Sequence, residues 1–138
     1  MSKGLGITQR KVLALLQRQT GAVDPFALAG NVYRVRRGKG GVRSLTDAQL
    51  VAVRRALRGL EKTGKVYRVT RFKRTQWANE RTGLWMIIRD MQQTSAVIAE
   101  TGDEAAFRSH SHKMLPLIRR AKELGIDITS DKPPAPTK

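Results

Sequence analysis

The chain has 138 residues and a formal net charge of +16, from 27 lysines and arginines against 11 aspartates and glutamates. This length suits one domain with appendages, and the charge favours a polyanionic partner. The lack of cysteine excludes disulfide bonds, thiolate metal sites and cysteine nucleophiles. No apolar run approaches the roughly 18 residues of a membrane span, and the N-terminus lacks a secretory pattern. We therefore expect a cytoplasmic protein with no membrane partner.

The positive charge is concentrated in the middle of the chain. Residues 34–89 contain sixteen of the 27 cations and three of the 11 acids, whereas residues 90–138 contain seven of each. A run of charge is most often only a solvated surface. Its segregation into one segment indicates a nucleic-acid interface instead.

Two short helices are predicted before residue 34. Thr8 is expected to cap the first, with Ile7 and Val12 as a hydrophobic staple. Asp24 followed by Pro25 is typical of a helix start and predicts a second helix of about two turns. Its apolar residues are assigned to the core: Phe26, Leu28, Ala29, Val32 and Tyr33.

A basic, glycine-rich stretch, RVRRGKGGVR, follows at residues 34–43. No regular element is predicted there. The stretch does not match the phosphate-binding loop of nucleotide-binding proteins, so nucleotide binding is not expected. Cations in such a loop are suited to contact a nucleic-acid backbone. The candidates are Arg36, Arg37, Lys39 and Arg43.

The stretch from Ser44 to Val69 predicts an amphipathic helix that leads directly into a strand. Thr46 and Gln49 form a capping box, and Gly64 supplies the left-handed residue that ends the helix. The core face carries Leu45, Leu50, Val53, Leu57 and Leu60. The opposite face carries Val51, Ala52, Arg55, Arg58 and Lys62.

A β-hairpin with a long loop is predicted next, with strands at Lys65–Phe72 and Leu84–Arg89. The loop, Lys73–Gly83, carries further candidate contacts to nucleic acid: Lys73, Arg74, Trp77 and Arg81. The tryptophan either packs on a sugar or base, or folds back to anchor the loop on the domain. The sequence leaves both alternatives open.

Three helices followed by a hairpin, with the cations on the third helix and hairpin, is the layout of the winged helix-turn-helix. The run Val53–Val66 resembles the junction between recognition helix and wing in bacterial and archaeal winged helix-turn-helix DNA-binding proteins. The resemblance implies an α+β, mostly helical domain over residues 1–89, whose third helix enters the major groove. The hairpin wing would touch the flanking minor groove or backbone. This chain departs from the pattern in its long basic loop before the third helix and its long wing loop.

A neutral helical extension is predicted over residues 90–128. Ile88, Met91, Ser95 and Ile98 form a helical seam, and Gly102-Asp103 marks a break and a new start. Pro116 predicts either a kink or two short helices. The extension either packs on the domain or pairs two protomers; the resemblance implies a homodimer formed through residues 90–125. Residues 129–138 lack apolar periodicity and contain three prolines, so we expect disorder.

No catalytic, metal or cofactor site is predicted. His110 and His112 are the only histidines, and a spacing of two directs them to different sides of a helix. Asp47 and Glu61 lie about four turns apart on one helix and cannot share an ion. We therefore expect a non-enzymatic protein.

The sequence as a whole favours a double-stranded DNA-binding protein, a dimeric transcriptional regulator or nucleoid-associated architectural factor. Val51, Ala52, Arg55 and Arg58 would face the major groove, and Lys62, Lys73, Arg74 and Arg81 would grip phosphates or the minor groove. One alternative is an RNA-binding or nucleoprotein-complex subunit that uses the same basic face. Another is a protein-interaction module within a larger complex. The seven aromatic residues, two Trp, two Tyr and three Phe, are too few to favour a reader of stacked single strands.

Overall fold

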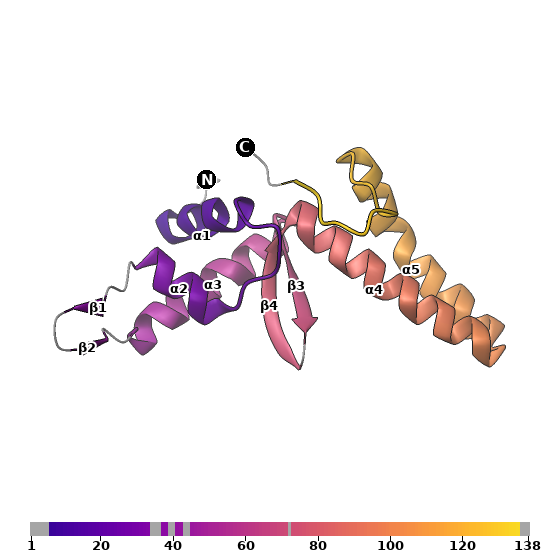
Figure 1. Cartoon of the computed structure of the whole chain (residues 1–138), viewed down its shortest axis with the longest axis horizontal. Helices are drawn as coiled ribbons and strands as arrows, with labels where there is room; N and C mark the ends of the chain where they lie inside the picture. Colours follow the sequence, from indigo (N-terminus) through magenta and orange to yellow (C-terminus); the bar gives the residue numbers. More distant parts are fainter. Residues whose placement is uncertain (1–5, 34–36, 39–40, 43–44, 72, 136–138) are drawn as a thin grey trace.

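The protein is α+β and mostly helical in the computed structural model, which describes residues 6–33, 37–38, 41–42, 45–71 and 73–135. Within these ranges five helices flank an antiparallel hairpin, β3–β4, and a shorter strand pair, β1–β2, precedes α3. The elements are α1 (Ile7–Gln17), α2 (Pro25–Val32), β1 (Arg37–Gly38), β2 (Gly41–Val42), α3 (Asp47–Lys62), β3 (Val66–Arg71), β4 (Arg74–Asn79), α4 (Glu80–Thr101) and α5 (Glu104–Glu123). Figure 1 shows the hairpin between the α1–α3 bundle and the α4–α5 pair. No helix in the described ranges combines the length and apolarity needed to cross a membrane.

The first two helices begin close to their predicted starts. Helix α1 begins at Ile7, and the side chain of Gln9 accepts a hydrogen bond from the Gly6 N–H at 3.2 Å, so the prediction that Thr8 caps this helix was wrong. Asp24 caps α2 as predicted, accepting from the Ala27 N–H at 2.9 Å. Phe26 was wrongly assigned to the core, because it is 64% exposed in the first turn of α2. The later residues of this short helix fill the core instead: Leu28, Ala29 and Val32.

Helix α3 confirms the predicted capping and core face. Thr46 Oγ1 accepts from the Gln49 N–H at 3.1 Å, and Gln49 Oε1 accepts from the Thr46 N–H at 3.0 Å. The core positions Val53, Leu57 and Leu60 are fully buried, and Gly64 adopts a φ of 75° at the helix end. Ahead of α3, the prediction of no regular element in residues 34–43 was wrong for β1 and β2, whose backbones pair in antiparallel register.

The second strand of the hairpin lies ten residues earlier than predicted. Strand β3 pairs with β4 from Val66↔Asn79 to Arg71↔Arg74, so the strands are separated by two residues and not by the predicted long wing loop. The predicted strand Leu84–Arg89 is helical and belongs to α4. A short apolar run does not by itself distinguish a strand from a buried helix. Here Leu84 and Ile88, one helical turn apart, are both fully buried.

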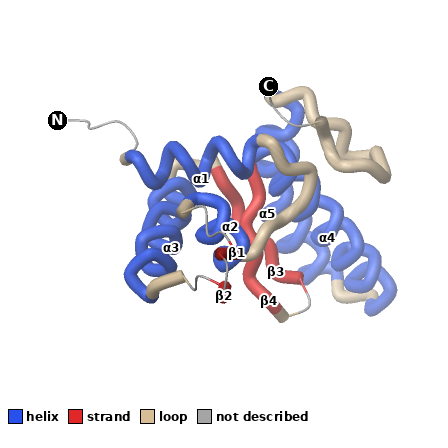
Figure 2. Tube along the Cα trace, turned by 60° about the vertical axis from the view of Figure 1, so that its left-hand side comes forward, coloured by secondary structure: helices blue, strands red, loops and turns tan. Residues whose placement is uncertain are grey.

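Each face of the β3–β4 hairpin packs against a different core. Val66 and Trp77 join the core of α1, α2 and α3, whereas Tyr67 packs against the core between α4 and α5. Successive residues of a strand point to opposite faces, which explains this division. Gly83 of α4 approaches β3 so closely that an added Cβ would lie 2.6 Å from the Tyr67 Cβ. The second view also places the hairpin between the two helical groups (Figure 2).

Helices α4 and α5 are separated at the predicted break and pack against each other as an antiparallel pair (Figure 1). Gly102 ends α4 with a φ of 75°, and Asp103 caps α5 by accepting from the Ala106 N–H at 3.0 Å. His110 Nε2 donates to the Met91 carbonyl at 2.8 Å, which links the two helices. Helix α5 continues through Pro116, so the alternative of two short helices was wrong.

The C-terminal segment folds back onto α4. Trp85 Nε1 and Arg89 Nη1 both donate to the Ser130 carbonyl, at 3.1 and 2.7 Å. The Thr129 hydroxyl and backbone N–H lower the pKa of the Asp127 carboxyl by hydrogen bonding. The prediction of disorder was therefore wrong for residues 129–131, and residues 136–138 lie outside the described ranges.

Candidate nucleic-acid interface

The outer face of α3 presents the predicted cations to solvent. Arg55, Arg58 and Lys62 are exposed, and Val51, on the same side of the helix, is 43% exposed. Ala52 is only half-buried, at the edge of the core face, so it belongs less clearly to the outer surface than predicted. The helix packs on α1, α2 and β3 through its opposite face. We call Val51, Arg55, Arg58 and Lys62 the α3 outer face.

Three arginines line a hollow where α3 meets the hairpin. Arg54 and Arg58 come from α3 and Arg68 from β3, and the hollow has a volume of about 290 Å³. Its remaining wall is formed by Pro25, Thr75 and Trp77. We call this hollow the arginine cleft. It joins the outer face of α3 to the side of the hairpin.

Two of these arginines were missed by the sequence prediction. Arg54 lies four residues before Arg58, a spacing that places both on one side of a helix. Arg68 lies two residues after the buried Val66, a spacing that places both on one face of a strand. These spacings were available in the sequence. The sequence does not show that Arg54, Arg58 and Arg68 converge, because this depends on how β3 is placed against α3.

Arg68 is held in place by two contacts of different kinds. Its Nη2 donates to Glu61 Oε1 at 3.0 Å, and its guanidinium lies 5.1 Å from the centroid of the Trp77 ring. Both contacts orient the planar guanidinium, since a cation over an indole face is attracted to its quadrupole. Within the described ranges, Arg54 and Arg58 have neither an acidic nor a hydrogen-bonding partner.

Trp77 anchors the hairpin and does not face solvent. The residue is 5% exposed, and its backbone exchanges two hydrogen bonds with Val23, both of 2.8 Å. Of the two alternatives, anchoring is confirmed, and the assignment of Trp77 to the DNA contacts was wrong. Trp77 forms part of the wall of the arginine cleft and contacts Arg68 there.

The remaining predicted contacts fall into three groups. Lys73 and Arg74 lie exposed at the tip of the hairpin, as a contact to nucleic acid requires. Arg81 is partly buried on α4, where its Nη1 donates to the Leu124 carbonyl at 2.7 Å, so the structure places it apart from the exposed cations of the hairpin tip. Arg36, Lys39, Arg43 and the side chain of Arg37 lie outside the described residues.

The hairpin turn carries backbone strain. Lys73 has a φ of 62°, a left-handed conformation that costs a residue with a Cβ about 1 kcal/mol. Replacing Lys73 by glycine is expected to raise the free energy of unfolding by up to about 1 kcal/mol, because glycine adopts this conformation without the clash. Urea denaturation measures the change. Equal or lower stability of the variant would contradict it.

The described part of the chain contains no group of three acidic or histidine side chains that could hold a metal ion. His110 is engaged with Met91, and His112 is exposed on α5. No family model, curated protein or solved structure matches this chain. The function is therefore inferred from the cationic surface itself.

Proposed function

We propose that the protein binds double-stranded DNA without catalysing a reaction, with α3 in the major groove and the β3–β4 hairpin as a wing beside it. The observation that carries this proposal is the unobstructed outer face of α3, which presents Arg55, Arg58 and Lys62 next to a hairpin with a cationic tip. The major groove of B-DNA is about 12 Å wide and admits one helix. Cations on helix and wing would neutralise phosphates on both sides of that groove.

The winged helix-turn-helix arrangement belongs to the same proposal. The Val23–Trp77 bridge ties the segment before α2 to β4 by backbone hydrogen bonds, and the three helices share a core with the hairpin. A wing held in this way keeps its spacing from α3. Fixed spacing is what allows one surface to contact a groove and its flanking backbone together.

The chemistry of the outer face suits the edges of base pairs. Arginine pairs with the O6 and N7 atoms of guanine, and a small apolar side chain packs on the thymine methyl group. Arg55 and the 43%-exposed Val51 provide one group of each kind, one helical turn apart. The deep, narrow major groove of A-form RNA does not admit a helix. This comparison favours duplex DNA over duplex RNA.

We further propose that two copies pair through residues 90–125 and act as a transcriptional regulator or architectural factor. Phe107 and Leu115 of α5 are 41% and 52% exposed and lie two turns apart on that helix. A symmetric pair would bind two half-sites about one helical turn of DNA apart. Sedimentation of the full chain, free and bound to a selected duplex, tests this part separately from DNA binding.

Salt dependence provides the test of DNA binding. If a dimer makes roughly six to ten phosphate contacts, affinity for duplex DNA should fall by about 10³ to 10⁵ between 50 and 200 mM salt. The measurement is fluorescence anisotropy with a labelled duplex, and single-stranded DNA and duplex RNA serve as competitors. A flat salt response would refute the proposal, and preferential competition by RNA would assign the basic face to RNA instead.

A further inference from the structure

We propose that the arginine cleft is a clamp for one phosphate of the DNA backbone, and that base reading is left to Arg55 on the neighbouring part of the α3 outer face. The cleft brings Arg54, Arg58 and Arg68 from two elements to one hollow. This inference rests on the proposed function, because it assigns a role to one part of the same interface. The inference gives different roles to Arg55 and Arg58, which were predicted from the sequence to lie together in the major groove.

The division follows from the positions of the side chains around α3. At 3.6 residues per turn, Arg54 and Arg58 lie about 40° apart, while Arg55 lies about 60° from Arg58 and about 100° from Arg54. Arg54 and Arg58 line the cleft and Arg55 does not. A phosphate held against the hairpin side of the helix would therefore leave Arg55 directed at the groove.

The charge distribution in the cleft favours an anion. Within the described ranges, three guanidinium groups share the hollow and only Arg68 has an acidic partner, Glu61. The acid next to Pro25, Asp24, is used to cap α2. Converging cations repel one another until an anion separates them, and the planar fork of arginine matches a phosphate with two hydrogen bonds. The exposed Thr75 beside them supplies a hydroxyl group that can donate a further one.

The cleft is also partly preorganised. Arg68 is already oriented by the Trp77 ring at 5.1 Å and by Glu61 at 3.0 Å, so little of its freedom remains to be lost on binding. Arg54 and Arg58 remain free to close over the ligand from α3. The hairpin is fixed in turn by the backbone bridge between Val23 and Trp77.

The test compares salt slopes of DNA binding. Each phosphate contact contributes about 0.9 to the slope of log affinity against log salt. The double variant Arg54→Ala/Arg58→Ala should lower the slope by about 0.9, so that its affinity falls about 3.5 times less than that of the wild type between 50 and 200 mM salt. Because the two arginines share one phosphate, each single variant keeps one arginine on it and should lose less of the slope than the double variant. Preference between two unrelated duplexes should not change, whereas Arg55→Ala should alter it.

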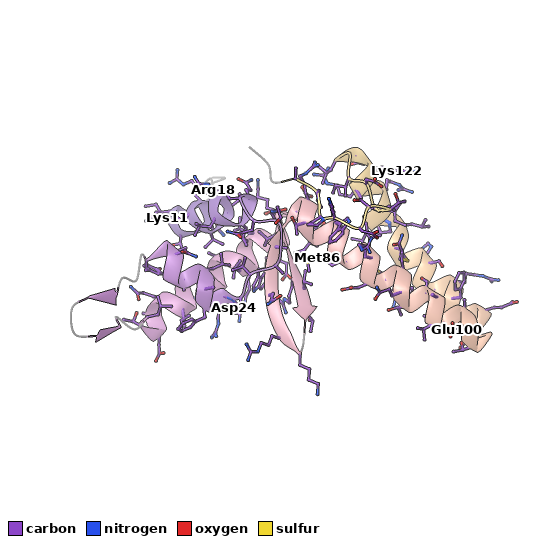
Figure 3. The ribbon with its side chains drawn as sticks, viewed as in Figure 1. Lys11, Arg18, Asp24, Met86, Glu100 and Lys122 are labelled. Atoms are coloured by element: carbon purple, nitrogen blue, oxygen red, sulfur yellow. The ribbon has the colours of Figure 1, made fainter. Side chains whose placement is uncertain are left out.

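Lys11→Ala and Arg18→Ala are matched controls. Each removes one exposed positive charge from α1, which lies on the side of the domain away from the hairpin tip (Figure 3). These variants should keep the wild-type slope. Circular dichroism verifies that all variants are folded. Arg68→Lys tests the third arginine of the cleft while keeping its positive charge. This variant should bind DNA more weakly at every salt concentration and should keep the wild-type slope.

The possible outcomes separate the clamp from the proposed function. If the wild type binds duplex DNA with a steep slope that the double variant Arg54→Ala/Arg58→Ala leaves unchanged, the clamp is refuted and the proposed function stands. A loss of about 1.8 in the double variant would show two separate phosphates and also refute it. If the wild type does not bind duplex DNA, the proposed function fails, and the clamp fails with it.

Discussion

Replacing Asn79 by aspartate is expected to lower the free energy of unfolding at pH 7 by about 3 kcal/mol or more. Asn79 is 4% exposed. Its Nδ2 donates to the carbonyls of Leu16 and Gln19 at 2.7 and 3.0 Å, and its Oδ1 accepts from the Thr82 N–H at 2.8 Å. One side chain therefore joins the end of α1 to the start of α4. Aspartate would keep the helix cap but would direct a buried negative charge at two carbonyl oxygens.

The pH dependence of the Asn79→Asp variant provides a second test. Burial without donors disfavours the charged form, so the pKa of the new carboxyl should be higher in the folded than in the unfolded chain, where it is about 3.9. A group whose pKa is raised by folding stabilises the folded state at low pH, and this contribution is lost as the pH rises through the folded pKa. The deficit relative to the wild type should therefore shrink as the pH falls toward 4.

Asn31→Asp is the matched control for this substitution. Asn31 also donates its Nδ2 to a backbone carbonyl, that of Ala27 at 3.2 Å, but it is exposed on α2. Its replacement should cost less than about 1 kcal/mol, since water solvates the new charge and only the unfavourable helix dipole remains. Urea denaturation of both variants measures the difference. Equal stability of the two variants would show that the buried hydrogen bonds of Asn79 do not join α1 to α4.

Replacing Gly83 by alanine is expected to lower the free energy of unfolding by about 1 to 2 kcal/mol. The new Cβ would lie 2.6 Å from the Cβ and 3.2 Å from the Cγ of Tyr67. A Cβ cannot rotate away, so α4 or β3 must shift, and overpacking of this kind costs about 1–3 kcal/mol. The higher helix propensity of alanine returns up to about 1 kcal/mol. Thermal and urea denaturation both measure the net loss.

Gly59→Ala provides the control for helix propensity. The added Cβ would meet Gln9 Nε2, the far end of a flexible side chain that can move aside. The gain in helix propensity is then offset only by the weakened contact of Gln9 with the Gly6 N–H, and the net change should lie within about 1 kcal/mol of zero or be favourable. A Gly83→Ala variant as stable as Gly59→Ala would refute the close approach of α4 to β3.

Tyr67 reports on the same contact independently of stability. Burial raises the pKa of its phenol above the usual value, Glu80 raises it further and Arg120 opposes the shift. If alanine at position 83 moves α4 outward, both the burial and the proximity of Glu80 decrease, and the pKa should fall toward that of a free tyrosine. An ultraviolet titration measures the pKa of Tyr67 in the wild type and in Gly83→Ala. Tyr33 provides a second tyrosine whose surroundings Gly83→Ala does not alter.

The sequence determined the features that depend on residues a few positions apart. The capping box of Thr46 and Gln49, the cap at Asp24 and the turn at Gly102 close hydrogen bonds over short spans. The core face of α3 follows from the period of one helix. The concentration of charge in residues 34–89 is a property of composition alone. The basic outer face of α3 was therefore predictable, with its helix bounds.

The tertiary structure decided everything that depends on which distant surfaces meet. The apolar run at residues 84–89 suited a strand or a helix. The run is helical in α4, where Leu84 and Ile88 are buried against α5. Trp77 became an anchor because β4 pairs with Val23 across more than fifty residues. The convergence of Arg54, Arg58 and Arg68 needed β3 placed against α3. Burial and convergence are long-range properties, which no local pattern of residues encodes.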